Sequence, residues 1–349
     1  REIGMTPRAV VLEPAGRNTA PAAAVAAVLS EEISRDALLL VLPSDHVIKD
    51  TDKFLEVILT AREVAMQGRL VTLGAPVVRA ETGYGYIQPG EELTGTPGCY
   101  QVSTFVEKPE QATADKYFNS GNYFWNTGIF MFSAKTYLRE LETFHPKIVS
   151  LSRSAVEKNK SDLDFIRLND EVFEKNTTIS IDYAVMENSN KTAVVPADMG
   201  WSDVGSWDAL WEISPQDEHG NVILGDVMTE HVENSYIRSE NKLVAAIGLK
   251  NTILVSTDDA VLVVGKDHAQ KVKGLVEKLK EKASNLHIFH TKIYRPWGWY
   301  QSLEVGEHYQ VKLIYLAPGA KISLQRHQHR AEHWVVVTGT ATVTRGSQI

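Results

Sequence analysis

The spacing of apolar and polar residues changes along the chain, and these changes predict three structural regions. From Val10 to about Val195, continuous apolar runs alternate with stretches of helical spacing. That alternation is typical of an α/β layer fold. Within it, the run "ALLLVLPSDH" (residues 37–46) fits a buried parallel strand that ends at Pro43.

Two segments of this first part carry helix signals. "RNTAPAAAVAAVLSEEI" offers Asn18 or Thr19 as a cap and has Pro21 in its first turn. "TDKFLEVILTAREVAMQG" has helical spacing, and Gly68 is its predicted stop. Strand-like runs follow, namely "LVTLGA", "YQVSTFVEK" and "GIFMF".

Beyond His219 the sequence pattern becomes typical of short β-strands. Short runs such as "NVILGDV" and "TILVST" are punctuated by Gly, Asn and Asp, without a strict repeat that can be read. Stacked strands of a β-helix-like kind fit them better than helices do. A solvated amphipathic helix near residues 267–285 would then link to an antiparallel β-barrel or jelly roll. We expect boundaries at residues 1–216, 217–290 and 291–349.

Composition narrows the class of protein. Of the 349 residues, 43% are apolar and 23% are charged, as in ordinary soluble globular proteins. The net charge of -8 leaves no basic field for nucleic acid, and no apolar run is long enough to span a bilayer. The single Cys99 excludes an internal disulfide framework and predicts a reducing, cytoplasmic location.

Two aspartates at loop tips suggest a Mg²⁺ site. Asp45 follows the strand "LLLVL", where open α/β sheets bind ligands, and Asp203 lies in the loop "GWSDVGSW". Such a pair suits a Mg²⁺ ion that bridges a nucleotide and a second phosphate. Alternatively, Asp45 forms an Asx-turn or a helix cap. Trp201 and its neighbouring tryptophans are predicted to pack rather than to stack on bases.

Two further motifs have both a functional and a structural interpretation. In "ETGYGYI", Gly83 and Gly85 flank Tyr84, so the backbone can lie against a sugar ring or simply form a tight turn. In "FVEKP", Glu107 and Lys108 end a strand, where they could hold sugar hydroxyls and a phosphate. A surface ion pair is the alternative there.

The segment "LQRHQHRAEHW" suggests a second metal site. On a strand, His327 and His329 would face the same side together with Gln325, and Glu332 would follow before another strand, "HWVVVTG". Such a set suits Zn²⁺ or another divalent ion. Surface histidines on an edge strand are the alternative.

The motifs together, in their order, give a resemblance to a known family. "EPAGRNTAPA", "LPSDH", "ETGYGYI", "FVEKP", "WNTGIF", "SIDYAVME" and "GWSDVGSW" occur as in sugar nucleotidylyltransferases. More narrowly, the chain resembles the bacterial bifunctional mannose-1-phosphate guanylyltransferases, which carry a type II mannose-6-phosphate isomerase domain. The resemblance covers nearly the whole chain. It implies a Rossmann-like, GT-A-like nucleotidyltransferase domain, a left-handed β-helix-like region and the start of a cupin β-barrel.

The resemblance also implies roles for single residues. Asp45 and Asp203 would hold Mg²⁺, and Lys108 would bind the sugar phosphate. The sugar hydroxyls would be read by Glu107, Asn126 and the backbone around Gly85. Asp182 would contribute as a ligand or, equally, as a helix N-cap. GTP and mannose 1-phosphate would be the substrates and GDP-mannose the product, for polysaccharide synthesis.

The resemblance also implies which residues face the nucleotide base. Glu13, Arg17 and Asn18 match the segment that faces the base. A Glu13 carboxylate could accept hydrogen bonds from guanine but not from adenine in this way, and a Glu13–Arg17 ion pair is the alternative.

The chain begins with Arg1, so we expect that the family's glycine-rich phosphate loop precedes it. We also expect that the rest of the barrel follows Ile349, and that the 349 residues alone have little of either activity.

Two other functions stay open from the sequence. The first is transfer to another sugar 1-phosphate or from another nucleotide, and the second is a non-catalytic module that binds a nucleotide sugar. Nucleotide binding without release of pyrophosphate would favour the binding module. Whether the protein forms a homo-oligomer is also left open.

Overall fold

The chain folds into two units, residues 1–213 and residues 214–349. The computed structural model describes residues 5, 7–34, 36–162, 165–282, 291–344 and 346. None of the described helices is long and apolar enough to cross a membrane.

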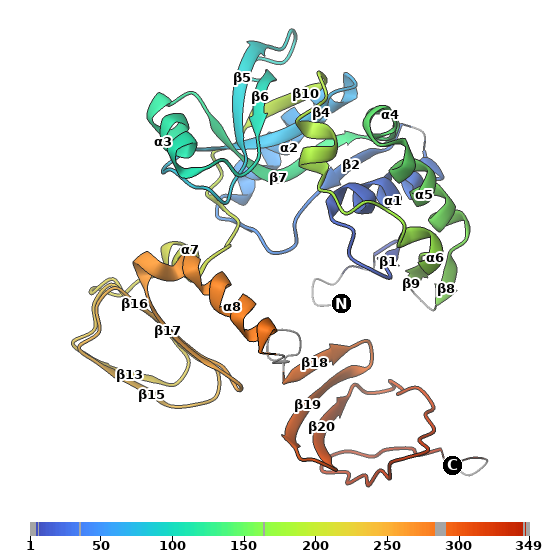
Figure 1. The fold of residues 1–349 in the computed structure, drawn as a ribbon, viewed down its shortest axis with the longest axis vertical. Coiled ribbons are helices and arrows are strands. Elements are labelled where there is room, and N and C mark those ends of the chain that lie inside the picture. The colour runs from blue at the N-terminus through green and yellow to red at the C-terminus, as the bar shows by residue number, and fades with distance from the viewer. Residues whose placement is uncertain are drawn as a thin grey trace. The chain divides into compact units, whose positions relative to one another are not determined.

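A mixed sheet of six strands forms the centre of the first unit (Figure 1). β4 and β10 are parallel, whereas the other pairings are antiparallel. From one edge to the other the order is β2 (Leu38–Val41), β7 (Phe124–Ser133), β4 (Leu70–Pro76), β10 (Thr192–Pro196), β6 (Tyr100–Val106) and β5 (Tyr86–Glu92).

The prediction that residues 37–46 contain a buried parallel strand is wrong in two respects. β2 pairs antiparallel with β7, with Leu39 opposite Phe132, and Leu39 is the one buried residue of its four. A continuous apolar run indicates a strand, but the direction of its neighbour depends on where a distant segment enters the sheet. The α/β class itself is confirmed.

Helices cover both faces of the sheet because its strands alternate their side chains. On one face Leu70, Phe132 and Val194 pack with α1 (Thr19–Glu31), α4 (Ala134–Phe144) and α5 (Pro146–Glu157). On the other face Val71 and Met131 pack with α2 (Thr51–Met66). Adjacent residues of one strand thus serve two separate cores.

The predicted helix signals are confirmed. The Asn18 side chain accepts a hydrogen bond from the Thr19 N–H at 2.8 Å and caps α1. α2 ends at Met66, and Gly68 follows with a φ of 80°, a left-handed conformation that glycine adopts without strain.

Shorter elements surround the sheet. A small sheet orders β1 (Val10–Leu12), β9 (Phe165–Arg167) and β8 (Lys160–Asp162). A two-stranded ribbon joins β3 (Val47–Ile48) to β11 (Trp201–Ser202). The remaining helical elements are α3 (Gln111–Ser120), α6 (Asp170–Phe173), the π-helical turn η1 (Asp182–Met186) and α7 (Trp207–Ile213).

The second unit begins with two stacks of parallel strands. One stack contains β12 (Val222–Leu224), β14 (Tyr236–Ser239) and β16 (Thr252–Ser256), and the other contains β13 (Val227–Glu230) and β15 (Val244–Ile247). Tyr236 lies opposite Ile253 and Val227 opposite Val244. Both pairs are 17 residues apart in sequence, whereas Val222 lies opposite Tyr236 at a spacing of 14, so two of these three pairings share a spacing that the sequence did not reveal. The β-helix-like prediction is confirmed, and its left-handed sense stays a prediction.

The rungs end in an antiparallel strand, β17 (Val261–Gly265), and a helical linker. The linker consists of the 3₁₀-helix η2 (Lys266–Lys271) and α8 (Val272–Glu281). No residue of α8 is buried, as predicted for a solvated helix. β18 (Lys292–Arg295), β19 (Gly298–Val305) and β20 (Gln310–Leu316) then form an antiparallel sheet.

The strands predicted around His327, His329 and "HWVVVTG" are not formed. Within the described residues after Leu316, no segment is a strand, and Val335 and Val337 are 85% and 78% exposed. Period-two spacing favours a strand, but a strand also needs a neighbour that accepts and donates its backbone hydrogen bonds. No described segment of this chain supplies that neighbour.

Two glycines at rung corners provide a test of the β-helix-like region. A Cβ on Gly225 (φ +88°) would lie 1.9 Å from the Ser239 carbonyl oxygen, whereas a Cβ on Gly248 (φ +69°) would have nothing within 4 Å. We expect Gly225→Ala to destabilise the rungs by about 1–3 kcal/mol more than Gly248→Ala, because of overpacking. Native-state hydrogen exchange of peptides that cover residues 222–256 measures the difference. Equal losses of protection would contradict the close approach.

Candidate active site

Asp45 and Asp203 lie at the same end of the β3–β11 ribbon. The strands are antiparallel, with Val47 opposite Ser202. Continued by one residue, this register brings His46 opposite Asp203, and Asp45 precedes His46 directly. The ribbon therefore gathers the two predicted Mg²⁺ ligands from distant parts of the sequence.

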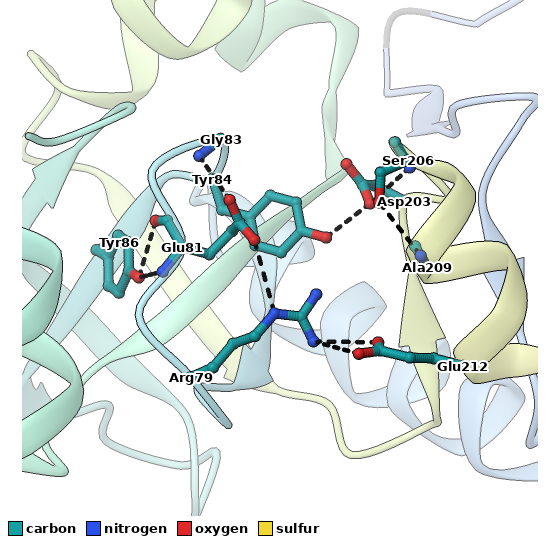
Figure 2. A network of polar contacts seen from close by, with 10 residues as sticks. Arg79, Glu81, Gly83, Tyr84, Tyr86, Asp203, Ser206, Ala209 and Glu212 are labelled. Atoms are coloured by element: carbon teal, nitrogen blue, oxygen red, sulfur yellow. Dashed lines mark hydrogen bonds and ion pairs between the residues drawn. The ribbon is translucent and has the colours of Figure 1, made fainter. Parts of the chain in front are cut away.

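Two donors fix one oxygen of the Asp203 carboxylate (Figure 2). The Tyr84 hydroxyl donates to Oδ1 at 2.6 Å, and the Gly205 N–H donates to the same oxygen at 3.0 Å. The Tyr84 ring contacts Trp125 and Trp201 edge-on, at centroid distances of 5.0 and 5.3 Å. Burial and then the hydrogen bond to Asp203 raise the pKa of Tyr84, so its hydroxyl stays protonated and donates.

Arg79 ties the loop that carries Tyr84 to helix α7. Its Nη1 lies 3.1 Å from an oxygen of Glu212, and its Nε lies 3.6 Å from an oxygen of Glu81 (Figure 2). The Tyr86 hydroxyl accepts from the Glu81 N–H at 2.8 Å and donates to the Glu81 carbonyl at 2.9 Å. The loop is thus held both internally and against the segment that bears Asp203.

Two non-glycine residues of the site have left-handed backbone. Val204, next to Asp203, has a φ of 52°, and Lys108 has a φ of 49°. A β-branched residue rarely adopts such a conformation, and each case costs on the order of 1–3 kcal/mol that the surrounding structure must offset. The Lys108 N–H donates to the Tyr84 carbonyl at 3.2 Å, and the Val204 N–H donates to Ser202 Oγ at 3.2 Å. Strained backbone of this kind is concentrated at functional sites.

Glu107 presents a buried carboxylate oxygen beside Gly85. Its Oε1 forms an ion pair with Lys108 Nζ at 2.6 Å, but the glutamate side chain is 8% exposed and the lysine 59%. Oε2 is buried and accepts no hydrogen bond from the described residues. Burial and then the charge of Asp182 raise the pKa of Glu107. Because a Cβ on Gly85 would lie 2.4 Å from this oxygen, the backbone approaches the carboxylate as closely as only glycine allows.

Asn126 connects this glycine to Asp182. Its N–H donates to the Gly85 carbonyl at 2.8 Å, and its Nδ2 donates to Asp182 Oδ1 at 2.7 Å. Its Oδ1 accepts from the Thr72 hydroxyl at 2.8 Å. Asp182 is the first residue of η1 and Ile181 precedes it as the cap residue, so the N-cap alternative is not adopted. Burial raises the pKa of Asp182.

The Arg17 side chain contacts a distant part of the chain and so holds its own segment in place. Its guanidinium donates to the Glu174 carbonyl and, at 3.5 Å, to Thr178 Oγ1. The alternative Glu13–Arg17 ion pair is absent from the described structure. The adjacent Thr19 hydroxyl accepts from the Ile181 N–H at 2.9 Å, so this segment runs beside the residue that precedes Asp182.

Glu13 lines a pocket between β1 and α1. The pocket is open, with a volume of about 410 Å³, and its other walls are apolar residues of these two elements. Burial raises the pKa of Glu13. Gly83, the other glycine of "ETGYGYI", donates its N–H to Glu81 Oε1 at 3.2 Å and so supports the loop rather than the carboxylate cluster.

The predicted isomerase metal set is only partly brought together. His327 Nε2 lies 3.1 Å from Glu332 Oε1, and Arg330 lies 3.0 Å from that same oxygen. Neither Gln325 nor His329 joins this cluster through a polar contact. Across the described parts of the chain, no group of three or more His, Cys, Asp or Glu could hold a metal ion. The four-residue metal site stays a prediction.

The sequence reasoning missed three residues of the site. His46 accepts a hydrogen bond from Trp201 Nε1 at 3.1 Å, and Glu187 accepts from the Glu107 N–H at 3.0 Å. Both residues lie in motifs that carried a signal: His46 directly follows Asp45 in "LPSDH", and Glu187 ends the motif "SIDYAVME" that contains Asp182. Arg79 has no such local signal, and its contact with Glu212 appears only in the folded chain.

The fold and site define a nucleotidyl transferase that continues into an isomerase-type region. The family model for nucleotidyl transferases matches residues 4–220. The model for the mannose-phosphate isomerase/GMP-like beta-helix domain matches residues 225–279, and the mannose-6-phosphate isomerase C-terminal model matches residues 282–349.

Named relatives narrow this class. The xanthan biosynthesis protein XanB of Xanthomonas campestris pv. campestris (strain B100) is 49% identical over 349 residues, covering 100% of this chain and 74% of its own. The mannose-1-phosphate guanylyltransferase of Escherichia coli (strain K12) is 47% identical over 348 residues, covering 99% and 73%. The chain belongs to the mannose-1-phosphate guanylyltransferase family of nucleotidyl transferases, with a mannose-6-phosphate isomerase C-terminal region.

Two solved structures agree with this assignment. The crystal structure of mannose-1-phosphate geranyltransferase from Thermus thermophilus superposes with a TM-score of 0.68. The two sequences are 34% identical, and the match covers 77% of each chain. Mannose-6-phosphate isomerase from Helicobacter pylori is 33% identical with a TM-score of 0.50, covering 56% of this chain and 73% of that one.

The hydrogen bonds of Asn126 predict a large loss on its removal. Asn126→Ala leaves the Thr72 hydroxyl without its acceptor and removes one of the donors to the buried Asp182, and each such loss costs about 1–3 kcal/mol. We therefore expect the free energy of unfolding to fall by about 2–4 kcal/mol in a urea titration followed by tryptophan fluorescence. Asn122→Ala, at an exposed position of the preceding loop, is the control and should change it by less than about 0.5 kcal/mol. Similar losses in the two variants would contradict the network.

Proposed function

We propose that this protein is a mannose-1-phosphate guanylyltransferase. A phosphate oxygen of mannose 1-phosphate attacks the α-phosphorus of GTP, the bond from that phosphorus to the β-phosphate oxygen breaks, and GDP-mannose and pyrophosphate leave. The observation that carries the proposal is the linked cluster of Gly85, Glu107, Lys108, Asn126 and Asp182 in a chain 47% identical to a named enzyme of this activity. Such reactions need positioning and charge neutralisation rather than covalent catalysis.

Asp45 and Asp203 suit a Mg²⁺ ion. Mg²⁺ in phosphoryl-transfer sites is usually held by one or two carboxylates together with substrate phosphates, which two loop-tip aspartates at one end of a ribbon provide. Asp203 keeps Oδ2 free of the two donors that hold Oδ1. When bound, the ion would neutralise charge on the phosphates.

The carboxylate beside Gly85 is proposed to bind the sugar. The unpaired, buried Oε2 of Glu107 is an acceptor for a mannose hydroxyl, and a hydroxyl there would satisfy a group that is costly to leave without a partner. Asn126 and the backbone of Gly85 would complete the contacts. Lys108, whose side chain is 59% exposed, would hold the 1-phosphate.

The pocket beside Glu13 is proposed for the guanine base. Its apolar walls suit a planar base, and a carboxylate accepts from both the N1–H and the exocyclic amine of guanine. Arg17 and Asn18 support this segment through their own contacts. Because adenine lacks the N1–H donor, GTP is the expected nucleotide.

The setting of the reaction follows from the same proposal. GDP-mannose would serve polysaccharide synthesis, in keeping with the name of the xanthan relative. The free, buried Cys99 supports a reducing, cytoplasmic location. For the C-terminal region we propose isomerisation of mannose 6-phosphate and fructose 6-phosphate, with Zn²⁺ or another divalent ion held by Gln325, His327, His329 and Glu332.

If Asp203 binds the metal ion, replacing it should abolish pyrophosphate release without unfolding the protein. In the full-length protein, pyrophosphate release should be highest with GTP and mannose 1-phosphate among four nucleotides and several sugar 1-phosphates. Asp203→Ala should abolish that release and lower the free energy of unfolding by no more than about 1–3 kcal/mol, which is the cost of the unpaired Tyr84 hydroxyl. A structural ion-pair carboxylate would instead cost about 3–5 kcal/mol. Early unfolding, or near-normal turnover, would overturn the assignment.

The proposed role of Lys108 predicts an unequal effect on the two substrates. Lys108→Ala removes a charge-assisted contact of about 1.5–3 kcal/mol, so KM for mannose 1-phosphate should rise roughly ten- to a hundredfold. KM for GTP should change far less. Lys116→Ala, on the neighbouring helix α3, controls for the loss of one positive charge. A similar rise in both KM values would contradict the role.

A further inference from the structure

The structure assigns Tyr84 as a positioning residue for Asp203, and this assignment rests on the proposed function. The sequence predicts that the backbone around Tyr84 lies against a sugar ring or forms a tight turn. In the folded chain its hydroxyl is already committed, since it donates to Asp203 Oδ1 at 2.6 Å. We propose that this hydrogen bond aims the free oxygen of Asp203 at the divalent cation.

The direction of the hydroxyl is set by a packed ring. The ring of Tyr84 stands edge-on to Trp125 at 5.0 Å and to Trp201 at 5.3 Å, with interplanar angles of 80° and 62°. Trp201 belongs to β11, two residues before Asp203. The ring is therefore fixed by the same strand whose end carries the carboxylate.

Asp203 is held from its other side by its own backbone. Gly205 donates its N–H to the same Oδ1 at 3.0 Å, and a Cβ on Gly205 would lie 2.6 Å from Oδ2. Val204 between them is in the left-handed region. The turn thus wraps around the carboxylate closely, so that two donors share Oδ1 while Oδ2 has no donor among the described residues.

A second contact keeps the two segments together. Arg79, five residues before Tyr84, pairs with Glu212 of α7 at 3.1 Å (Figure 2). The Tyr84–Asp203 hydrogen bond and the Arg79–Glu212 ion pair therefore both link the same pair of segments. Carboxylates that bind metals are commonly oriented by such outer hydrogen bonds, and loss of one lowers metal affinity by roughly 10- to 100-fold.

Tyr84→Phe tests the assignment because it removes the hydroxyl and keeps the ring between the two tryptophans. Mn²⁺ is titrated into the full-length protein with saturating GDP-mannose, and free Mn²⁺ is measured by electron paramagnetic resonance. We expect Mn²⁺ to bind roughly 10- to 100-fold more weakly than to the wild type. In parallel kinetics, kcat should fall while KM for mannose 1-phosphate stays unchanged.

Tyr86→Phe is the matched control. It removes the hydroxyl of the first residue of β5, which bonds to the loop only at the backbone of Glu81, so any general loosening of the loop appears in both variants. We expect its Mn²⁺ affinity to equal that of the wild type. Equal weakening in both variants would show a merely structural role and overturn the proposal.

Two further outcomes separate this proposal from the proposed function. If Tyr84→Phe binds Mn²⁺ as the wild type does but raises KM for mannose 1-phosphate, the hydroxyl contacts the sugar and the positioning role is wrong. If Asp203→Ala retains pyrophosphate release, or if the wild type binds no Mn²⁺, the metal role of Asp203 fails and the positioning role fails with it.

Discussion

The pairing of β3 with β11 is the constraint on which the rest of the site depends. This two-residue ribbon holds the loop after β2 against the loop after β10, with Val47 opposite Ser202. A slip of one residue would turn each side chain of the ribbon to the other face and would separate His46 from Asp203. The side-chain hydrogen bond between Trp201 and His46 joins the same two segments in addition to the backbone hydrogen bonds of the ribbon.

Close approach of backbone to carboxylate recurs on both sides of the site. Gly85 lies against Glu107, and Gly205 lies against Asp203, so closely that a Cβ on either glycine would displace the carboxylate. Val204 and Lys108 add left-handed backbone next to these carboxylates. The strain is tolerated because a packed sheet with cores on both faces surrounds it, as is usual where a site must hold charged groups in fixed geometry.

The two parts of the second unit show how repetition and pairing determine β structure. In the rungs, β13 pairs with β15 and β14 with β16 at a spacing of 17 residues, so the strands stack in parallel although the sequences of the rungs differ. After Leu316, valine-rich segments have the alternation typical of strands but no neighbour within the described chain. Local pattern is therefore necessary for a strand but does not form one without a partner.

The sequence alone determined the elements whose physics is local. Asn18 as a cap, Gly68 as a stop and the solvated helix α8 follow from side-chain hydrogen bonding, backbone freedom and helical spacing. The ordered motifs also predicted the family and most of the residues in the candidate site. The sequence could not give the antiparallel direction of β2, the 17-residue spacing of two strand pairings or the contacts of Arg79, His46 and Glu187. Nor could it show that Tyr84 turns toward Asp203. These features join segments far apart in the chain, and only the tertiary structure brings such segments within hydrogen-bonding distance.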